Sequence, residues 1–177
     1  MRDFHLPGRS PVFAQNGICA TSHPLAAKTA INILESGGNA MDAAIAGAVL
    51  LGFCEPQMTG LGGDCFVLFS PAGTEEIKAM NGSGKAPKGL SAQMMRDKGH
   101  QFVPTESVDS ITIPGAIDAF CQLSNDWGIL GLDTILAPAI KYATEGVPVA
   151  PKVAYDWSNA VNRLHASAKS KFSHSGQ

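Results

Sequence analysis

The chain has 177 residues, of which 45% are hydrophobic and 16% are charged, and this balance is typical of one globular domain with a substantial core. The formal net charge is −2, and acidic and basic residues are interspersed. Because no segment concentrates positive charge, neither nucleic acid nor an anionic membrane surface is an expected partner.

The sequence shows neither a targeting segment nor a membrane span. Residues 1–13 carry charges but no apolar run as long as that of a signal peptide, and the apolar stretch Met41–Cys54 is too short to cross a bilayer. These features predict a cytoplasmic protein with no contact to membranes.

Cysteine usage gives no sign of a disulfide framework or a metal site. The four cysteines lack CxxC spacing and mostly have apolar neighbours; they are Cys19, Cys54, Cys65 and Cys121. We therefore expect buried free thiols, with no metal and no cofactor.

A short strand and a helix are predicted first. Residues 18–20 favour a strand, and Pro24 stands at a good first helical position. Apolar residues then recur at i, i+3 and i+4 as far as Leu34, which indicates an amphipathic helix. Gly37 is placed to follow the end of that helix in a left-handed conformation.

A second helix, ending at Cys54, is expected to be central and closely packed. Asn39 can cap it, and Asp42 in its first turn opposes the helix dipole favourably. Its alanines and glycine leave little side-chain bulk, so that a neighbouring element can approach closely. Leucine in place of Ala44 or Ala46 is therefore predicted to overpack the core.

Two glycine-containing loops enclose a predicted β-hairpin. Residues 57–64 (QMTGLGGD) form the first loop, which lacks dinucleotide-fingerprint spacing and is simply interpreted as a tight turn from helix to strand. Residues 65–70 and 76–81 are predicted to be the two strands, and NGSG then ends the sheet.

Helix signals dominate the remainder of the chain. They begin at Ser91, Pro114, Asp133 and Pro151, whereas the tail, residues 168–177, shows neither helix nor strand signal. Helices and a hairpin in this order predict an α+β fold, with helices layered against an antiparallel sheet.

The second glycine loop, NGSGKAP, is a candidate anion site. It places the Ser83 hydroxyl, the Lys85 ammonium and several backbone amides within a few residues of Asn81, which suits a carboxylate or another small anion. The alternative is a polar hairpin exit with a solvated lysine.

Thr21, Ser22 and His23 place two hydroxyls beside an imidazole. A freed N-terminal threonine is one form of activated nucleophile. The favoured interpretation is nevertheless a strand-to-helix junction, in which Thr21 or Ser22 caps the helix that follows.

Five motifs in one order carry a family resemblance. They are ATSHPLAAKTAINILESGGNAMDAAIA, EPQMTGLGGDCFVLF, EIKAMNGSGKAP, ITIPGAIDAF and LAPAIKYATEGVPVAP. From about Arg9 to about Pro151, the chain resembles the N-terminal part of the large subunit in the gamma-glutamyltransferase (gamma-glutamyltranspeptidase) family.

The resemblance implies that residues 1–177 are part of an N-terminal nucleophile hydrolase αββα sandwich. Members of the family are precursors that cleave themselves, and the new N-terminal threonine attacks a gamma-glutamyl amide to form an acyl-enzyme. That threonine and the oxyanion hole would lie beyond Gln177, so that no catalytic residue is assigned here. The implied partner is the C-terminal part of the same precursor, the small subunit. We expect the isolated chain to be inactive and to expose unpaired strand edges and an uncovered apolar face.

One departure from the family bears on substrate. The family's D-x-R-E-x-A-P motif clamps a glutamyl carboxylate through its arginine, and Ser83 stands at that position here. Serine lacks a bidentate cationic fork, whereas Lys85 offers a point charge two residues on. The predicted substrate-side residues are Ser83, Lys85 and Asn81, for a gamma-glutamyl or related amide. A beta-lactam side-chain acylase and a non-catalytic module that binds a small anion or a partner are the alternatives.

Overall fold

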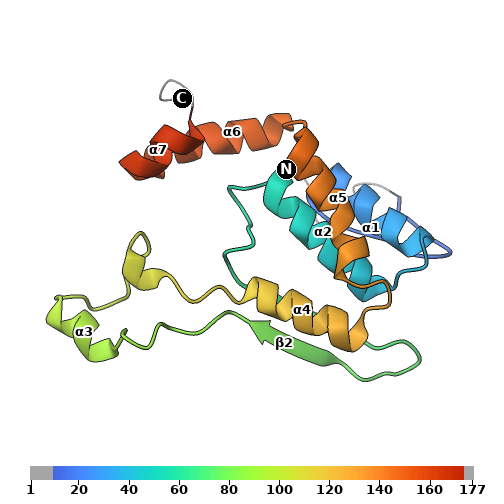
Figure 1. Ribbon diagram of the computed structural model, residues 1–177, viewed down its shortest axis with the longest axis horizontal. Coiled ribbons are helices and arrows are strands. Elements are labelled where there is room, and N and C mark those ends of the chain that lie inside the picture. The colour runs from blue at the N-terminus through green and yellow to red at the C-terminus, as the bar shows by residue number, and fades with distance from the viewer. Residues whose placement is uncertain (1–9, 174–177) are drawn as a thin grey trace.

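A layer of helices packs on one face of a two-stranded antiparallel sheet in the computed structural model, which describes residues 10–173 (Figure 1). Residues 1–9, which hold most of the segment used to predict the cytoplasmic location, lie outside the described residues, as do residues 174–177 at the end of the tail. The elements in chain order are α1 (Pro24–Glu35), α2 (Ala40–Cys54), β1 (Cys65–Phe69), β2 (Lys78–Gly82), α3 (Ala92–Asp97), η1 (Val108–Ser110), α4 (Ala116–Trp127), α5 (Leu132–Glu145), α6 (Pro151–Ala160), η2 (Val161–Arg163) and α7 (Ala166–Phe172).

Helix α2 is the centre of the helical layer, as predicted. It contacts α1, α4 and α5, and its Ile45 and Leu50 are almost fully buried. Gly47 faces α1 at close range: a Cβ built there would lie 3.6 Å from the Ala26 carbonyl oxygen and 3.8 Å from Ala30 Cβ. The small side chains thus allow α1 and α2 to pack closely.

The Asp42 carboxylate joins the start of α2 to the link between α4 and α5. It is fully buried, and Asn39 N–H donates to it over 3.1 Å in a reciprocal capping box. The N–H groups of Ile129 and Leu130 donate to the same carboxylate at 3.0 and 3.3 Å. A charged acceptor for three backbone donors makes these two distant segments one unit.

The hairpin pairs β1 with β2, with Cys65 opposite Gly82 and Phe69 opposite Lys78. Strand β2 begins two residues later than expected, because residues 70–77 are used in the turn. The Phe69 ring meets Trp127 of α4 edge-on, with 5.1 Å between ring centroids. This contact fixes the hairpin to the helical layer.

The opposite face of the hairpin is uncovered, as predicted. Phe66 and Leu68 are 65% and 77% exposed, and Ile77 just before β2 is 73% exposed. Strand side chains alternate between the two faces of a sheet, so that Val67, Phe69 and Met80 pack on the core while their neighbours point outward.

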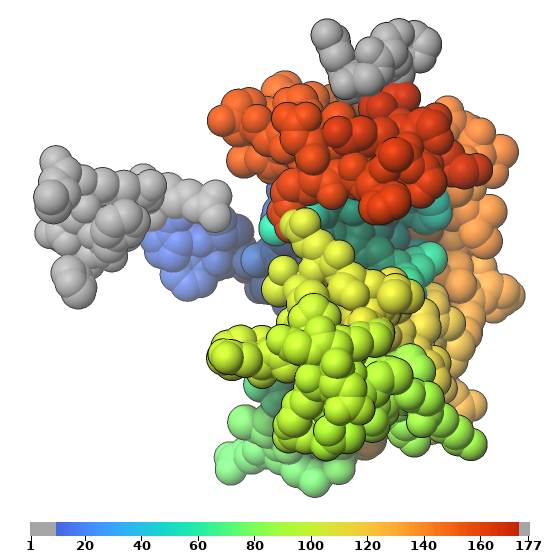
Figure 2. All heavy atoms as spheres, turned by 90° about the vertical axis from the view of Figure 1, so that its left-hand side faces the viewer, coloured from blue at the N-terminus to red at the C-terminus, as the bar shows by residue number. Residues whose placement is uncertain are grey.

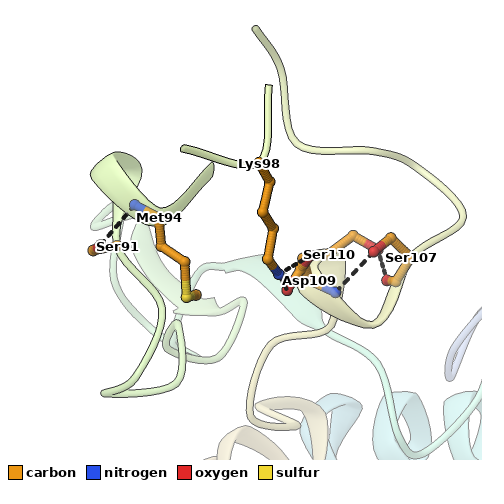
Figure 3. A network of polar contacts seen from close by, with 6 residues as sticks. All are labelled: Ser91, Met94, Lys98, Ser107, Asp109 and Ser110. Carbon is orange, nitrogen blue, oxygen red and sulfur yellow. Dashed lines mark hydrogen bonds and ion pairs between the residues drawn. The ribbon is translucent and has the colours of Figure 1, made fainter. Parts of the chain in front are cut away.

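Residues 83–115 leave the sheet, form α3 and η1, and return to α4 (Figure 1). Figure 3 shows Lys98, which follows α3, reaching Asp109 in η1 at 2.8 Å. Ser91 caps α3 by accepting from Met94 N–H, as predicted, and Ser107 accepts from Asp109 N–H. These short-range bonds hold a segment that has little core of its own.

Helices α6 and α7 form an arm in which one aromatic pair joins the two helices. The rings of Trp157 and Phe172 meet edge-on, with 6.3 Å between their centroids, and Trp157 Nε1 donates to the Phe172 carbonyl over 3.2 Å. A cavity of about 940 Å³ lies between the arm, residues 105–111 and the loop after α2, and Arg163 of η2 reaches across it to Glu106 at 3.4 Å. Figure 2 shows this hollow between the red arm and the yellow-green segment that contains α3 and η1.

Three sequence predictions were wrong in part. Residues 18–20 form no regular secondary structure and do not pair with any strand in the described range. The tail contributes to α7, because Trp157 supplies a tertiary contact that local sequence does not report. All four cysteines are free, but only Cys54 is buried. Cys121 is exposed because its position falls on the outer side of α4.

Two helix starts also differ from prediction. The N-cap of α5 is Gly131, and Asp133 lies in its first turn, while α4 is capped by Gly115 after Pro114.

None of the helices within residues 10–173 combines the length and hydropathy of a membrane span.

The two alanines proposed as overpacking sites now separate into a test and its control. Ala46 is 1% exposed, whereas Ala44 is exposed, contrary to the prediction that both face the core. Ala46→Leu is expected to lower the free energy of unfolding of the complete protein by about 1–3 kcal/mol. Ala44→Leu should change it by less than about 0.5 kcal/mol. Equal values in urea unfolding would contradict the buried orientation of Ala46.

The Asp42 carboxylate offers a second stability test. Asp42→Asn keeps the shape but turns an amide toward backbone donors, and we expect a loss on the order of 1.5–3 kcal/mol in the free energy of unfolding. Asp133→Asn, on the exposed first turn of α5, should cost at most about 1 kcal/mol. A smaller loss for Asp42→Asn than for Asp133→Asn would show that the buried carboxylate is not the clamp.

Candidate functional site

Three of the sequence motifs meet at the start of α4. The Gly63 carbonyl, in the first glycine loop, accepts from the N–H groups of Gly115 and Ala116, both at 3.1 Å. The first turn of a helix has unsatisfied N–H groups, and here the protein's own carbonyl takes two of them. This helix start is therefore occupied by the loop and does not present these two donors to a ligand.

The chain at the end of β2, residues 82–84, crosses the start of α4 so closely that the two backbones are in contact. A Cβ on Gly115 would overlap the Gly82 carbonyl oxygen and the Gly84 nitrogen, and a Cβ on Gly84 would overlap the Ile113 carbonyl oxygen. Gly84 also has φ of +75°, a left-handed conformation that disfavours other residues. Glycine is thus required at both 84 and 115 by space.

The segment at the end of β2, residues 81–85, carries the predicted substrate-side residues. Ser83 N–H donates to Asn81 Oδ1 at 3.0 Å, so that the carbonyl end of the Asn81 side chain shapes the turn. From outside, Thr112 Oγ1 donates to the Ser83 carbonyl at 3.2 Å and Ile113 N–H donates to the Lys85 carbonyl at 2.9 Å.

The side chains of this loop differ in exposure and in the polar groups that remain free to bind a ligand. Ser83 is half-buried, and its hydroxyl donates to the Gly84 carbonyl over a long 3.4 Å. Lys85 and Asn81 are exposed. Within residues 10–173, no carboxylate lies at ion-pair distance from Lys85. The loop therefore offers an ammonium, a hydroxyl and the Asn81 amide nitrogen to an acceptor-rich ligand.

Cys65, which pairs with Gly82 at the start of the loop, is a poor nucleophile. Burial, and then the neighbouring Asp64 carboxylate, raise the pKa of the Cys65 thiol. Burial and Glu55 likewise raise the pKa of Cys54. Because the thiolate is the reactive form, both thiols stay protonated near neutral pH and suit a structural role.

The residues at the start of α1 do not assemble a nucleophile. His23, and not Thr21 or Ser22 as predicted, is the N-cap of α1, and its Nδ1 accepts from Leu25 N–H at 3.2 Å. The Ser22 hydroxyl donates to Glu55 at 2.6 Å and is thereby turned away from the helix start. In the described part of the chain, no three His, Cys, Asp or Glu side chains gather as a metal site would need.

Comparison with known proteins places this arrangement in a family. The family model described as gamma-glutamyltranspeptidase matches residues 26–177. The glutathione hydrolase-like YwrD proenzyme of Bacillus subtilis (strain 168) is 38% identical over 139 residues, which are 78% of this chain and 26% of that protein.

Two solved structures share the fold. The cephalosporin acylase from Bacillus halodurans has a TM-score of 0.77 at 38% identity, covering 96% of this chain and 32% of the other. The gamma-glutamyltranspeptidase of Helicobacter pylori has a TM-score of 0.83 at 30% identity, covering 94% of this chain and 49% of the other.

The fold is therefore part of an N-terminal nucleophile hydrolase sandwich, as the sequence predicted. The chain belongs to the gamma-glutamyltranspeptidase family and corresponds to the N-terminal part of the large subunit. It spans about a quarter of the length of the curated relatives it matches.

Sequence reasoning missed the residues that hold the candidate loop. Gly63, Thr112 and Gly115 contribute through backbone contacts or a single hydroxyl. Glycines permit a close approach of two backbones, but they do not indicate which segments approach one another. No local signal marked Thr112.

The glycine crossing gives a test with a matched control. Gly73 has the same φ of +75° as Gly84 but has open space around its Cα. Gly73→Ala should therefore cost only about 1–2 kcal/mol of unfolding free energy, from backbone strain. Gly84→Ala should cost about 1–3 kcal/mol more, because the Ile113 carbonyl must also move. Equal losses in urea unfolding of the complete protein would show that the crossing is loose.

Proposed function

We propose that the complete protein is a gamma-glutamyltransferase-like enzyme that transfers or hydrolyses gamma-glutamyl amides of the glutathione type. The proposed nucleophile is a threonine outside residues 1–177. The observation that supports this proposal most strongly is the substrate-side loop, residues 81–85, held against the start of α4 with an exposed lysine and a serine hydroxyl. In the sequence resemblance, NGSGKAP aligns with the family's carboxylate-binding motif D-x-R-E-x-A-P.

The proposed reaction proceeds in two steps. The threonine hydroxyl adds to the amide carbonyl, and collapse of the tetrahedral adduct releases the amine with a proton and leaves an ester on the threonine oxygen. Water or a second amine then attacks the ester and frees the threonine. In this scheme, Lys85 attracts a substrate carboxylate as a point charge, and Ser83 and Asn81 supply neutral hydrogen bonds. The present chain thus contributes orientation rather than bond-making groups.

We further propose that the C-terminal part of the same precursor covers the outer face of the hairpin. Phe66, Leu68 and Ile77 expose apolar surface there, and such surfaces are typical of an interface. The Bacillus relative is named a proenzyme, which supports a precursor that supplies both parts.

A beta-lactam side-chain acylase is the second candidate. Two observations favour it: Ser83 lacks the charge of a glutamyl clamp, and the chain is similar to the cephalosporin acylase structure at 38% identity. An acyl group without an α-carboxylate would not require a bidentate partner. A non-catalytic module that binds a small anion or a partner protein is the remaining alternative.

Kinetics of loop variants in the complete, processed protein test these assignments. Lys85→Met should lower kcat/KM for a gamma-glutamyl anilide by an amount equivalent to about 1.5–3 kcal/mol, as expected for a hydrogen bond to a charged group. Ser83→Arg should improve use of the same substrate by supplying a bidentate clamp. Lys88→Met, at a second exposed lysine three residues on, is the matched control and should have no effect.

The pattern of results separates the candidates. A preference for simple acyl amides, with little effect of Lys85→Met, favours the acylase. Unchanged kinetics in both loop variants across gamma-glutamyl and acyl amides would place the substrate site elsewhere. Binding of small anions without turnover of any amide would favour the non-catalytic module.

A further inference from the structure

The substrate-side loop has little internal support. Gly82 and Gly84 flank Ser83, and glycine has more conformational freedom to lose on ordering than any other residue. Within the loop, the Asn81 side chain accepts one bond, and the Ser83 hydroxyl makes a second, long one. The position of Ser83 must therefore be fixed mainly from outside the loop.

The start of the loop is tied to β1, where Asn81 and Gly82 pair with Phe66 and Cys65. Beyond the sheet, two hydrogen bonds from residues 112–113 provide the outside support. The bond from Ile113 N–H to the Lys85 carbonyl is between backbone groups, and any residue but proline would make it. The bond from Thr112 Oγ1 to the Ser83 carbonyl uses a side chain. Among residues 10–173, Thr112 is the side chain outside the loop that hydrogen-bonds to residues 82–85.

We propose that Thr112 is a positioning residue for substrate recognition, an inference that rests on the proposed function of the loop. By holding the Ser83 carbonyl, Thr112 fixes the peptide plane between Ser83 and Gly84, and so fixes the direction in which the Ser83 side chain leaves the backbone. A recognition group must be held within a fraction of an ångström to act. Thr112 is exposed, so that its hydroxyl serves this geometry rather than the core.

The structure provides a matched control at the other end of the hairpin. Thr74 is also exposed, and its hydroxyl donates to the Pro71 carbonyl at 3.0 Å in the turn between β1 and β2. Thr74→Val therefore removes the same kind of bond far from the loop along the hairpin. Thr112→Val removes the hydroxyl and keeps the side-chain shape, whereas Thr112→Ser keeps the hydroxyl.

The experiment measures kcat and KM of the complete, processed protein for gamma-glutamyl and simple acyl anilides, together with amide hydrogen exchange of the peptide that covers residues 81–86. We expect Thr112→Val to lower kcat/KM by about three- to tenfold, mainly through KM, as the loss of one neutral hydrogen bond predicts. Exchange in the peptide should become faster. Thr112→Ser should restore both readouts, and Thr74→Val should leave both unchanged.

Each other outcome counts against a defined part of the inference. Unchanged exchange in Thr112→Val would show that the hydroxyl does not hold the loop. Faster exchange with unchanged kcat/KM, or failure of Thr112→Ser to restore activity, would overturn the positioning role. If the wild-type protein turns over none of the amides, the proposed function fails, and hydrogen exchange still decides whether Thr112 holds the loop.

Discussion

The close crossing of two backbones at the start of α4 is the constraint on which the candidate site depends. Gly82 and Gly84 pass Gly115 without room for a Cβ on any of the three, while the Gly63 carbonyl accepts from the first N–H groups of the helix. Close packing in this layer transmits any displacement. The hairpin, the helix start and the loop with Ser83 and Lys85 therefore form one rigid junction, and a change in one of them changes the others.

The parts of the fold that the sequence predicted well are those decided by local chemistry. Asn39 and Ser91 cap helices because their side chains reach N–H groups two or three residues away, and such signals are complete within one turn. Residues 18–20 show the limit of this reasoning. Their composition favours a strand, but a strand exists only with a partner, and no described strand lies beside them.

The sequence located the candidate loop but not the contacts that hold it. Motif order located Ser83 and Lys85 on a glycine loop, and the structure places both there. The contacts that hold them come from residues about thirty positions later in the chain and are made largely to backbone carbonyls. Since every residue has a carbonyl, such contacts leave no trace in side-chain pattern. The sequence also did not distinguish the buried Ala46 from the exposed Ala44. A small side chain permits close packing, but it does not indicate which face of the helix is packed.

The Asp42 carboxylate has a consequence for the order in which the protein is made. It caps α2 soon after that helix leaves the ribosome, yet two of its three backbone donors, at Ile129 and Leu130, are synthesised almost ninety residues later. Domains fold as units while the chain grows, the N-terminal part first. The helical layer can thus close around this buried side chain as soon as the link between α4 and α5 has been translated.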